Sequence, residues 1–198
     1  MRRIFIGTLV VLTIALINGC ANRKITRVDP NETIDLSGRW NDSDSRLVSE
    51  EMIGDLLTSA WIPRYLKAND KRPVVVVGLV ENKSHEHINS ETFIKDVEKA
   101  IIRDGNIRLV VAGEKRNELR KERAEQQDYA SPETTKKWGK ELGADFILQG
   151  TINSIVDSYK KQKDVTYQID LQLTNIETNE VVWMGDKKIK KQISDRVL

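Results

Sequence analysis

Two histidines are the residues of this chain best suited to bind a metal or to move a proton at neutral pH. His85 and His87 form an H-x-H pair, which on a strand places both imidazoles on one side. A zinc site needs three or four ligands, and the nearby Glu86 and Glu91 do not complete one. Because the pair lies in the polar stretch NKSHEHINS, we expect two solvated loop residues; a hydrolase that uses both is the weaker alternative.

Two further stretches resemble ligand-binding loops in part. The sequence NDSD at 41–44 alternates oxygen ligands like the first half of a calcium loop, but it lacks that loop's later glycine and glutamate. We therefore expect Asp42 or Asp44 to cap a helix. The sequence GAD at 143–145 has no P-loop lysine, so Asp145 is expected at a helix-to-strand turn. The chain thus predicts no catalytic residue, no metal, no cofactor and no small-molecule substrate.

Tryptophan is the more informative aromatic residue, with four copies against three phenylalanines. Trp61 and Trp183 lie at apolar spacing, which indicates packing in a core. Trp40 stands in the polar sequence GRWND, so it either folds back onto the domain or contacts a partner. Trp40 is therefore the candidate partner-binding residue.

Two lysine clusters lie in the last third of the chain, KKQK at 160–163 and KKIKK at 187–191. Pairing of the last strands would bring them together. Lysine commonly protects an exposed strand edge, and this interpretation is favoured over a patch for an anionic ligand.

The N-terminus has the residue order of an export signal: basic, then apolar, then small. Arg2 and Arg3 precede an uncharged run from Ile4 to Ile17, shorter than the ~20 residues that span a bilayer as a helix. The run ends in INGC, which resembles a lipobox, and Cys20 is the only cysteine. We expect a signal peptide at residues 1–19 and lipidation of Cys20, with an ordinary signal peptide as the alternative. Two or more acyl chains would anchor the mature protein stably to a membrane.

The mature chain is formally neutral, because loss of Arg2 and Arg3 from the 32 basic residues leaves as many as the 30 acidic ones. A neutral chain has no overall field to attract nucleic acid. Residues 20–45 are polar and predict a lipidated N-terminus with a flexible tether, which extends to about 85 Å at most. Residues 46–198 are expected to form one globular domain. Ala21 follows the cysteine in place of an inner-membrane retention aspartate, which favours the outer membrane.

Apolar spacing predicts the elements of this domain. A helix is expected through RLVSEEMIGDLLTSAWI, bent or ended by Pro63. The run VVVVGLV at 74–80 is apolar on both faces, as in a central strand of a sheet covered on both sides. A strand at 107–112, an exposed charged helix at 114–127 and a helix at 131–142 are also expected. A further helix starts at Ser90 and ends near Gly105, lined by Phe93, Ile94, Val97, Ile101 and Ile102.

The final third alternates apolar with polar residues, which is typical of antiparallel strands. Residues Glu177 to Glu180 form the last turn. The order of elements predicts an α/β fold, a single domain with a mixed sheet flanked by helices, with early parallel strands and a C-terminal antiparallel meander. One strand face consists of Val165, Tyr167, Ile169, Leu171 and Leu173, and the opposite face of Thr166, Gln168, Asp170 and Gln172.

Three stretches resemble a known family: SGRWNDSDSRLVSEEMIGDLL, GADFILQGTI and YQIDLQLTNIETNEVVWMGDKKIKK. Together with the lipobox, they are similar to the LpoB-type outer-membrane lipoproteins that activate penicillin-binding proteins. The resemblance implies a globular α/β domain on a tether, without catalysis of its own, that binds a bifunctional peptidoglycan synthase. The enteric relatives have a long, proline-rich tether, whereas the tether here is short and nearly free of proline.

We therefore expect a lipid-anchored, non-enzymatic regulator on the periplasmic face of the outer membrane, acting on a class A penicillin-binding protein in peptidoglycan synthesis. To activate the synthase by contact, the regulator needs only to bind the active form of the synthase more tightly than the inactive form. A structural or secretion-associated envelope lipoprotein that binds other envelope proteins is the alternative.

Overall fold

The computed structural model describes residues 25–30, 32–131, 133–134 and 141–194, so the predicted signal peptide and Cys20 lie outside the described residues. The chain divides into two units, Met1–Glu32 and Thr33–Leu198. In the first unit the Glu32 backbone N–H donates to the Asp29 carbonyl at 3.0 Å. The second unit holds all the helices and strands described below.

The second unit is built on a five-stranded mixed sheet with the strand order β2-β1-β3-β4-β5. Strand β1 (Val74–Asn82) pairs in parallel with β2 (Arg108–Val110) on one side and with β3 (Phe146–Tyr159) on the other. Strands β3, β4 (Gln162–Asn175) and β5 (Val181–Ser194) form an antiparallel meander. This confirms the predicted α/β class with its early parallel and late antiparallel strands.

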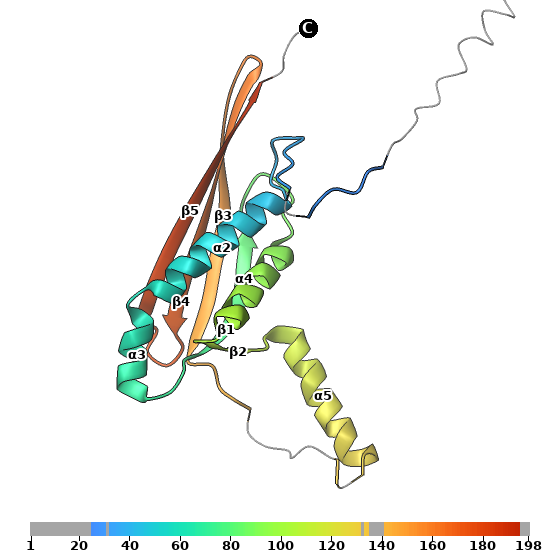
Figure 1. Ribbon diagram of the computed structural model, residues 1–198, viewed down its shortest axis with the longest axis vertical. Coiled ribbons are helices and arrows are strands. Elements are labelled where there is room, and N and C mark those ends of the chain that lie inside the picture. The colour runs from blue at the N-terminus through green and yellow to red at the C-terminus, as the bar shows by residue number, and fades with distance from the viewer. Residues whose placement is uncertain (1–24, 31, 132, 135–140, 195–198) are drawn as a thin grey trace, which may run out of the picture. The chain divides into compact units, whose positions relative to one another are not determined.

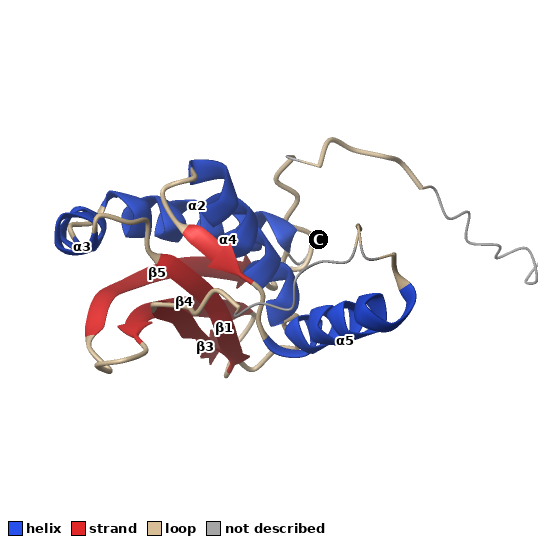
Figure 2. Ribbon diagram, turned by 90° about the horizontal axis from the view of Figure 1, so that it is seen from below, coloured by secondary structure: helices blue, strands red, loops and turns tan. Residues whose placement is uncertain are grey.

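Helices α2 (Asp42–Thr58) and α4 (Ser90–Asp104) lie against one face of this sheet, as Figures 1 and 2 show. The apolar side chains of β1, β3, β4 and the two helices form the core between these layers. Burying them is the main favourable term for folding, at about 25 cal/mol for each Å² of apolar surface. The largest fully buried side chains include Tyr167, Phe93, Ile53, Leu56, Ile101, Leu148 and Ile169.

Helix α2 begins at Asp42, inside the range that the sequence assigns to the tether. Its N-cap is Asn41, whose side chain accepts a hydrogen bond from the Asp44 N–H at 3.1 Å, while Asp44 accepts from the Asn41 N–H at 2.9 Å. This reciprocal capping box confirms a capping role for the NDSD stretch. The prediction that Asp42 or Asp44 is the cap itself was wrong, because Asp44 sits at the third helical position.

The helix break near Pro63 differs from the prediction. Helix α2 ends at Thr58, and a separate helix α3 (Trp61–Asn69) contains Pro63 in its first turn. A proline is tolerated there because first-turn N–H groups have no partner within the helix. Ser59, in extended conformation, therefore separates the two helices, and the proline does not.

Helix α4 confirms its prediction at both ends. The Asn89 side chain accepts from the Glu91 N–H, and Gly105 ends the helix in the left-handed conformation, with φ of 76°. Phe93, Val97 and Ile101 are buried, but Ile102 is 64% exposed and lies off the apolar stripe, contrary to the prediction.

Strand β1 is apolar on both faces, although the helices cover only one of them. Val75 and Val77 belong to the core. Val76 is also buried, and its register places it between Val110 of β2 and Ile147 of β3. Val76 is thus flanked within the sheet by residues of the two neighbouring strands, and its burial agrees with the predicted central strand.

Strand β2 and helix α5 agree in type with the sequence and differ in length. Strand β2 has three residues instead of six, and helix α5 (Gly113–Tyr129) is exposed as predicted, with no buried residue. The helix expected at 131–142 falls largely outside the described residues, and Glu141 and Leu142 are not helical. In β4 the predicted apolar face is buried from Val165 to Leu173.

Gly185 in β5 provides a test of this packing, because the Trp183 indole covers it. A Cβ atom at Gly185 would lie 2.4 Å from Cζ2 of Trp183. Trp183 would then have to move and lose the hydrogen bond from its Nε1 to Asp55 Oδ2, 2.9 Å long. We expect Gly185→Ala to lower the free energy of unfolding by about 1–3 kcal/mol, measured by urea denaturation.

Gly54→Ala is the matched control. Gly54 lies in the exposed part of α2 with nothing within 4 Å of an added Cβ. This substitution should raise the free energy of unfolding by about 0.5–1 kcal/mol. Equal effects of the two substitutions would contradict the proposed role of Trp183.

Candidate interaction site

Three segments that are distant in sequence meet at the ring of Tyr167 in β4. Trp40, just before α2, contacts this ring edge-on with the ring centroids 5.5 Å apart. His85, in the loop after β1, stacks on it at 6.3 Å. Tyr167 is fully buried, and burial raises the pKa of its hydroxyl, with the Glu86 carboxylate acting in the same direction. We call Trp40, His85, Glu86, Ser154 and Tyr167 the Tyr167 cluster.

Glu86 joins the two segments that approach Tyr167. Its Oε2 accepts a hydrogen bond from the Trp40 backbone N–H at 3.1 Å, and its Oε1 lies 3.4 Å from His85 Nε2. The loop that carries Glu86 is itself held, because Asn82 Nδ2 donates to the Glu86 carbonyl at 2.8 Å. One carboxylate thus fixes the chain before α2 against the loop after β1.

Ser154 in β3 completes the cluster from the sheet. Its Oγ accepts from the His85 backbone N–H at 3.0 Å and lies 2.7 Å from His85 Nδ1. Ser154, His85 and Glu86 therefore follow one another as in a serine, histidine and acid triad. Acyl transfer also requires oxyanion donors and a place for the substrate. Here the second carboxylate oxygen of Glu86 accepts from the Trp40 backbone N–H, and the two contacts of Ser154 with His85 attach the loop after β1 to β3. These three side chains therefore serve to hold chain segments together.

The two histidines do not come together as a ligand pair. Both are exposed, and His85 is in addition held by its contacts in the Tyr167 cluster. Across the part of the chain that the structure describes, no three His, Cys, Asp or Glu side chains are grouped so that they could hold a metal ion. Both histidines are exposed loop residues, as predicted, but the sequence did not reveal that His85 also contacts Ser154, Glu86 and Tyr167.

Trp40 folds back onto the domain, where it is partly buried against the core. Sequence reasoning treated Trp40 and His85 as unrelated candidates, and the structure places both on Tyr167. A direct contact between Trp40 and a partner stays a prediction.

Lys191 in β5 is the polar residue of this region that the sequence did not reveal. Only 8% of its side chain is exposed, and its Nζ lies 2.6 Å from Asp44 Oδ2 and 3.1 Å from Asp35 Oδ2. It also donates to the Arg39 carbonyl at 2.8 Å. Lys191 thus holds the whole segment 35–44 against β5. A signal was present, since Lys191 falls on the strand face shared by Trp183, Ile189 and Ile193.

The other lysines of β5 agree better with an edge strand protected by charge. Lys190 is 66% exposed and pairs with Asp164 at 3.1 Å, and Lys187 pairs with Glu51 of α2 at 2.5 Å. Exposed pairs of this kind contribute little to stability. The prediction of a solvated lysine edge is therefore correct for Lys190 and wrong for Lys191.

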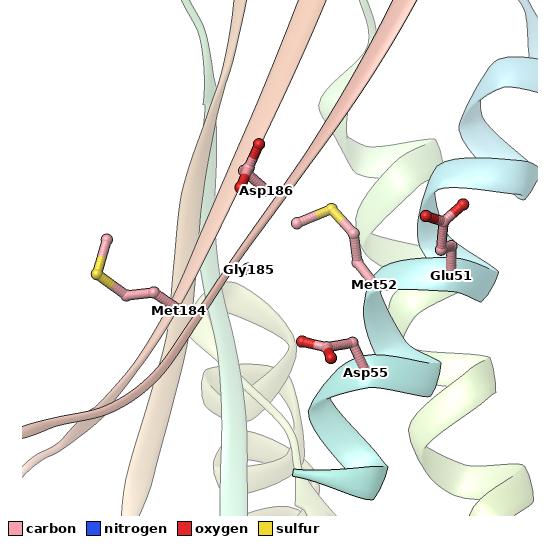
Figure 3. A pocket seen from close by; sticks show the side chains of 6 residues that line it. All are labelled: Glu51, Met52, Asp55, Met184, Gly185 and Asp186. Atoms are coloured by element: carbon pink, nitrogen blue, oxygen red, sulfur yellow. The ribbon is translucent and has the colours of Figure 1, made fainter.

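A groove of about 420 Å³ lies between α2 and β5 (Figure 3). Met52 and Asp55 point from α2 toward the strand, while Met184 points away from the helix. Glu51 and Asp55 already bind Lys187 and Trp183, respectively. The lining residues are Glu51, Met52, Asp55, Met184, Gly185 and Asp186.

Fold and site together define a class: a small α/β domain with a mixed sheet, in which the clustered polar side chains hold separate chain segments together. A family model described as peptidoglycan-synthase activator LpoB matches residues 44–189. The chain therefore belongs to the LpoB family, whose members are activators of peptidoglycan synthases. A search of curated protein sequences finds no match.

Solved structures with a similar fold include two from the same family. The LpoB C-terminal domain from Escherichia coli has 18% identity and a TM-score of 0.46, over 77% of this chain and 99% of that chain. The corresponding Salmonella enterica domain has 16% identity and a TM-score of 0.42, over 74% and 98%. Lipoprotein GNA1162 from Neisseria meningitidis has 14% identity and a TM-score of 0.38, over 61% and 83%.

Substitution of Lys191 tests whether it holds segment 35–44 in place. Lys191→Met leaves the Asp44 carboxylate, 10% exposed, without its cation. Breaking a buried pair in this way should lower the free energy of unfolding by about 3–5 kcal/mol in urea denaturation. Lys190→Met, in the exposed pair with Asp164, should cost less than ~1 kcal/mol.

A second variant separates charge from packing. Adding Asp44→Asn to Lys191→Met removes the unpaired carboxylate and should recover part of the lost stability. Equal stabilities of the Lys191→Met and Lys190→Met variants would show that Lys191 is not the holding residue.

Proposed function

We propose that this protein is a lipid-anchored, non-enzymatic regulator that binds and activates a bifunctional, class A penicillin-binding protein. The observation that carries the proposal is the family match over residues 44–189, which includes most of α2, strands β1 to β4 and most of β5. The role of the polar cluster supports it, because His85, Glu86 and Ser154 are engaged in holding chain segments together.

Activation by contact requires only that the domain binds the active conformation of the synthase more tightly than the inactive one. A domain whose segments are fixed to one another suits this task, because a rigid surface loses little conformational entropy on binding. The buried Lys191 pair and the Tyr167 cluster both restrict the chain before α2.

The anchor is the second part of the proposal: a signal peptide at 1–19, lipidation of Cys20 and attachment to the periplasmic face of the outer membrane. None of the helices in the described part of the chain has the length and apolar character needed to cross a bilayer. The compact unit starts at Thr33, so about 13 residues, at most about 45 Å when extended, separate it from Cys20. A synthase in the inner membrane would then have to extend toward the outer membrane.

Trp40 is proposed as part of the surface that contacts the synthase. Its indole is only partly buried, and it lies beside His85 on the Tyr167 ring. Tryptophan is enriched among the residues that dominate binding energy at protein interfaces. The exposed part of the ring is available for such a contact.

Activation is tested with purified components. The full-length lipidated protein should raise the glycosyltransferase rate of a class A penicillin-binding protein from the same cells, measured by consumption of fluorescent lipid II. A monofunctional glycosyltransferase is the matched control and should not respond. Unchanged synthase activity, together with co-purification of other envelope proteins without any penicillin-binding protein, would favour the structural or secretion-associated alternative.

Crosslinking tests the contact at Trp40. A photoreactive amino acid at position 40 should crosslink to the synthase in intact cells, detected as a shifted band that contains both proteins. The same probe at Trp183, which is 7% exposed, is the matched control and should give no such band. If neither position crosslinks while activation persists, the contact surface lies elsewhere and Trp40 serves packing.

A further inference from the structure

The end of the β3–β4 hairpin exposes large apolar side chains that the core does not use. We call residues 154–166 the hairpin tip. Ile155 is 69% exposed, Tyr159 is 71% exposed and Val156 is 40% exposed. Figure 1 shows the hairpin running beyond the N-terminal end of α2, so this helix does not cover it. A strand end of this kind is left free for a contact outside the domain.

The hairpin tip is also basic, in a mature chain whose overall formal charge is neutral. Lys160 and Lys161 form the turn, and the Lys160 ammonium lies 5.2 Å from the centre of the Tyr159 ring. Lys163 follows in β4, and the register brings Lys190 of β5 alongside Thr166. Against these four lysines stand two aspartates in the same region, Asp157 and Asp164, of which Asp164 is paired with Lys190.

The chain from the N-terminus enters the domain beside this tip. Lys191, which binds Asp35 and the Arg39 carbonyl, is paired across the sheet with Val165 of the tip. Gly38 packs so closely on Ile193 that an added Cβ would lie 2.4 Å from its Cγ1. The segment that leads back toward Cys20 is therefore fixed to the strand next to the hairpin tip.

We propose that the hairpin tip binds an anionic lipid surface, that of the membrane which holds the Cys20 anchor. Tyrosine suits the boundary between headgroups and acyl chains, with its ring in the apolar part and its hydroxyl in the polar part. Lysines near an anionic leaflet each strengthen binding roughly fivefold. The inference rests on the lipid anchor of the proposed function, which keeps Thr33, the start of the unit that carries the hairpin tip, within about 45 Å of the bilayer.

The test uses the full-length lipidated protein in vesicles, with a fluorescent reporter on the tip. Acylation blocks Cys20, so Gln162→Cys supplies a unique thiol for an environment-sensitive dye next to the exposed Tyr159. The dye emission should shift to the blue in vesicles that contain phosphatidylglycerol and not in pure phosphatidylcholine. Raising the salt to about 0.5 M should reduce the shift, because it screens the lysines.

Ala68→Cys is the matched labelling control. Ala68 is exposed on α3, which lies at the opposite end of the domain from the hairpin tip (Figure 1). Its dye should report water in both kinds of vesicle. Tyr159→Ser with Lys160→Gln and Lys161→Gln should abolish the shift at position 162, and an unchanged thermal unfolding midpoint would show that these exposed substitutions leave the fold intact.

Three outcomes would overturn the proposal: no shift at position 162, an equal shift at position 68, or a shift that occurs only after addition of the synthase. The last would assign the hairpin tip to a protein contact. Activation of the synthase is measured on the same samples. A lipid-dependent shift without activation would preserve this inference and reject the proposed function, and activation without a shift would do the reverse.

Discussion

The buried contact between Lys191 of β5 and Asp44 of α2 is the interaction on which the N-terminal edge of the domain depends. Asp44 has two roles, because one carboxylate oxygen accepts the Asn41 N–H of the capping box and also binds the Lys191 ammonium. Helix initiation and attachment to the sheet are therefore achieved by the same side chain. An ammonium removed from water is tolerated here because two carboxylates and a backbone carbonyl surround it.

This constraint orders the last part of the segment that the sequence predicts to be a tether. The polar composition of 20–45 resembles that of a tether throughout, yet the compact unit starts at Thr33 and its residues from Asp35 onward bind β5. Polar segments can be ordered when their hydrogen-bonding groups find partners in the domain, as Trp40 does with Glu86 and Asn41 does with Asp44. The composition of residues 20–45 shows only that they lack an apolar stripe. It does not show which groups elsewhere in the chain can accept or donate hydrogen bonds to them.

The sequence predicted those parts of the fold in which periodicity is decisive. Strand β1, helix α4 and the meander were found because apolar residues repeat there at strand or helix spacing. Strand β2 was predicted too long because it pairs with β1 only from Arg108 to Val110, and no local pattern records where that pairing ends. The site was predicted only in fragments: Trp40 and His85 were each named, but their meeting on Tyr167 depends on contacts across 82 to 127 residues of chain. The burial of Lys191 could have been predicted from its place on the apolar face of β5. Its contact with Asp44 could not, because the two residues are far apart in the sequence.

Trp40 lies close to the segment by which the chain enters the domain. Trp40 contacts Tyr167, which pairs with Ser154 at the base of the hairpin tip, and Lys191 fixes the incoming chain to the neighbouring strand. The candidate contact residue thus lies on the side of the domain where the tether enters. Under the proposed lipid anchor at Cys20, a partner that contacts Trp40 would approach the domain from the side of the anchoring membrane, and an inner-membrane synthase would have to extend toward it.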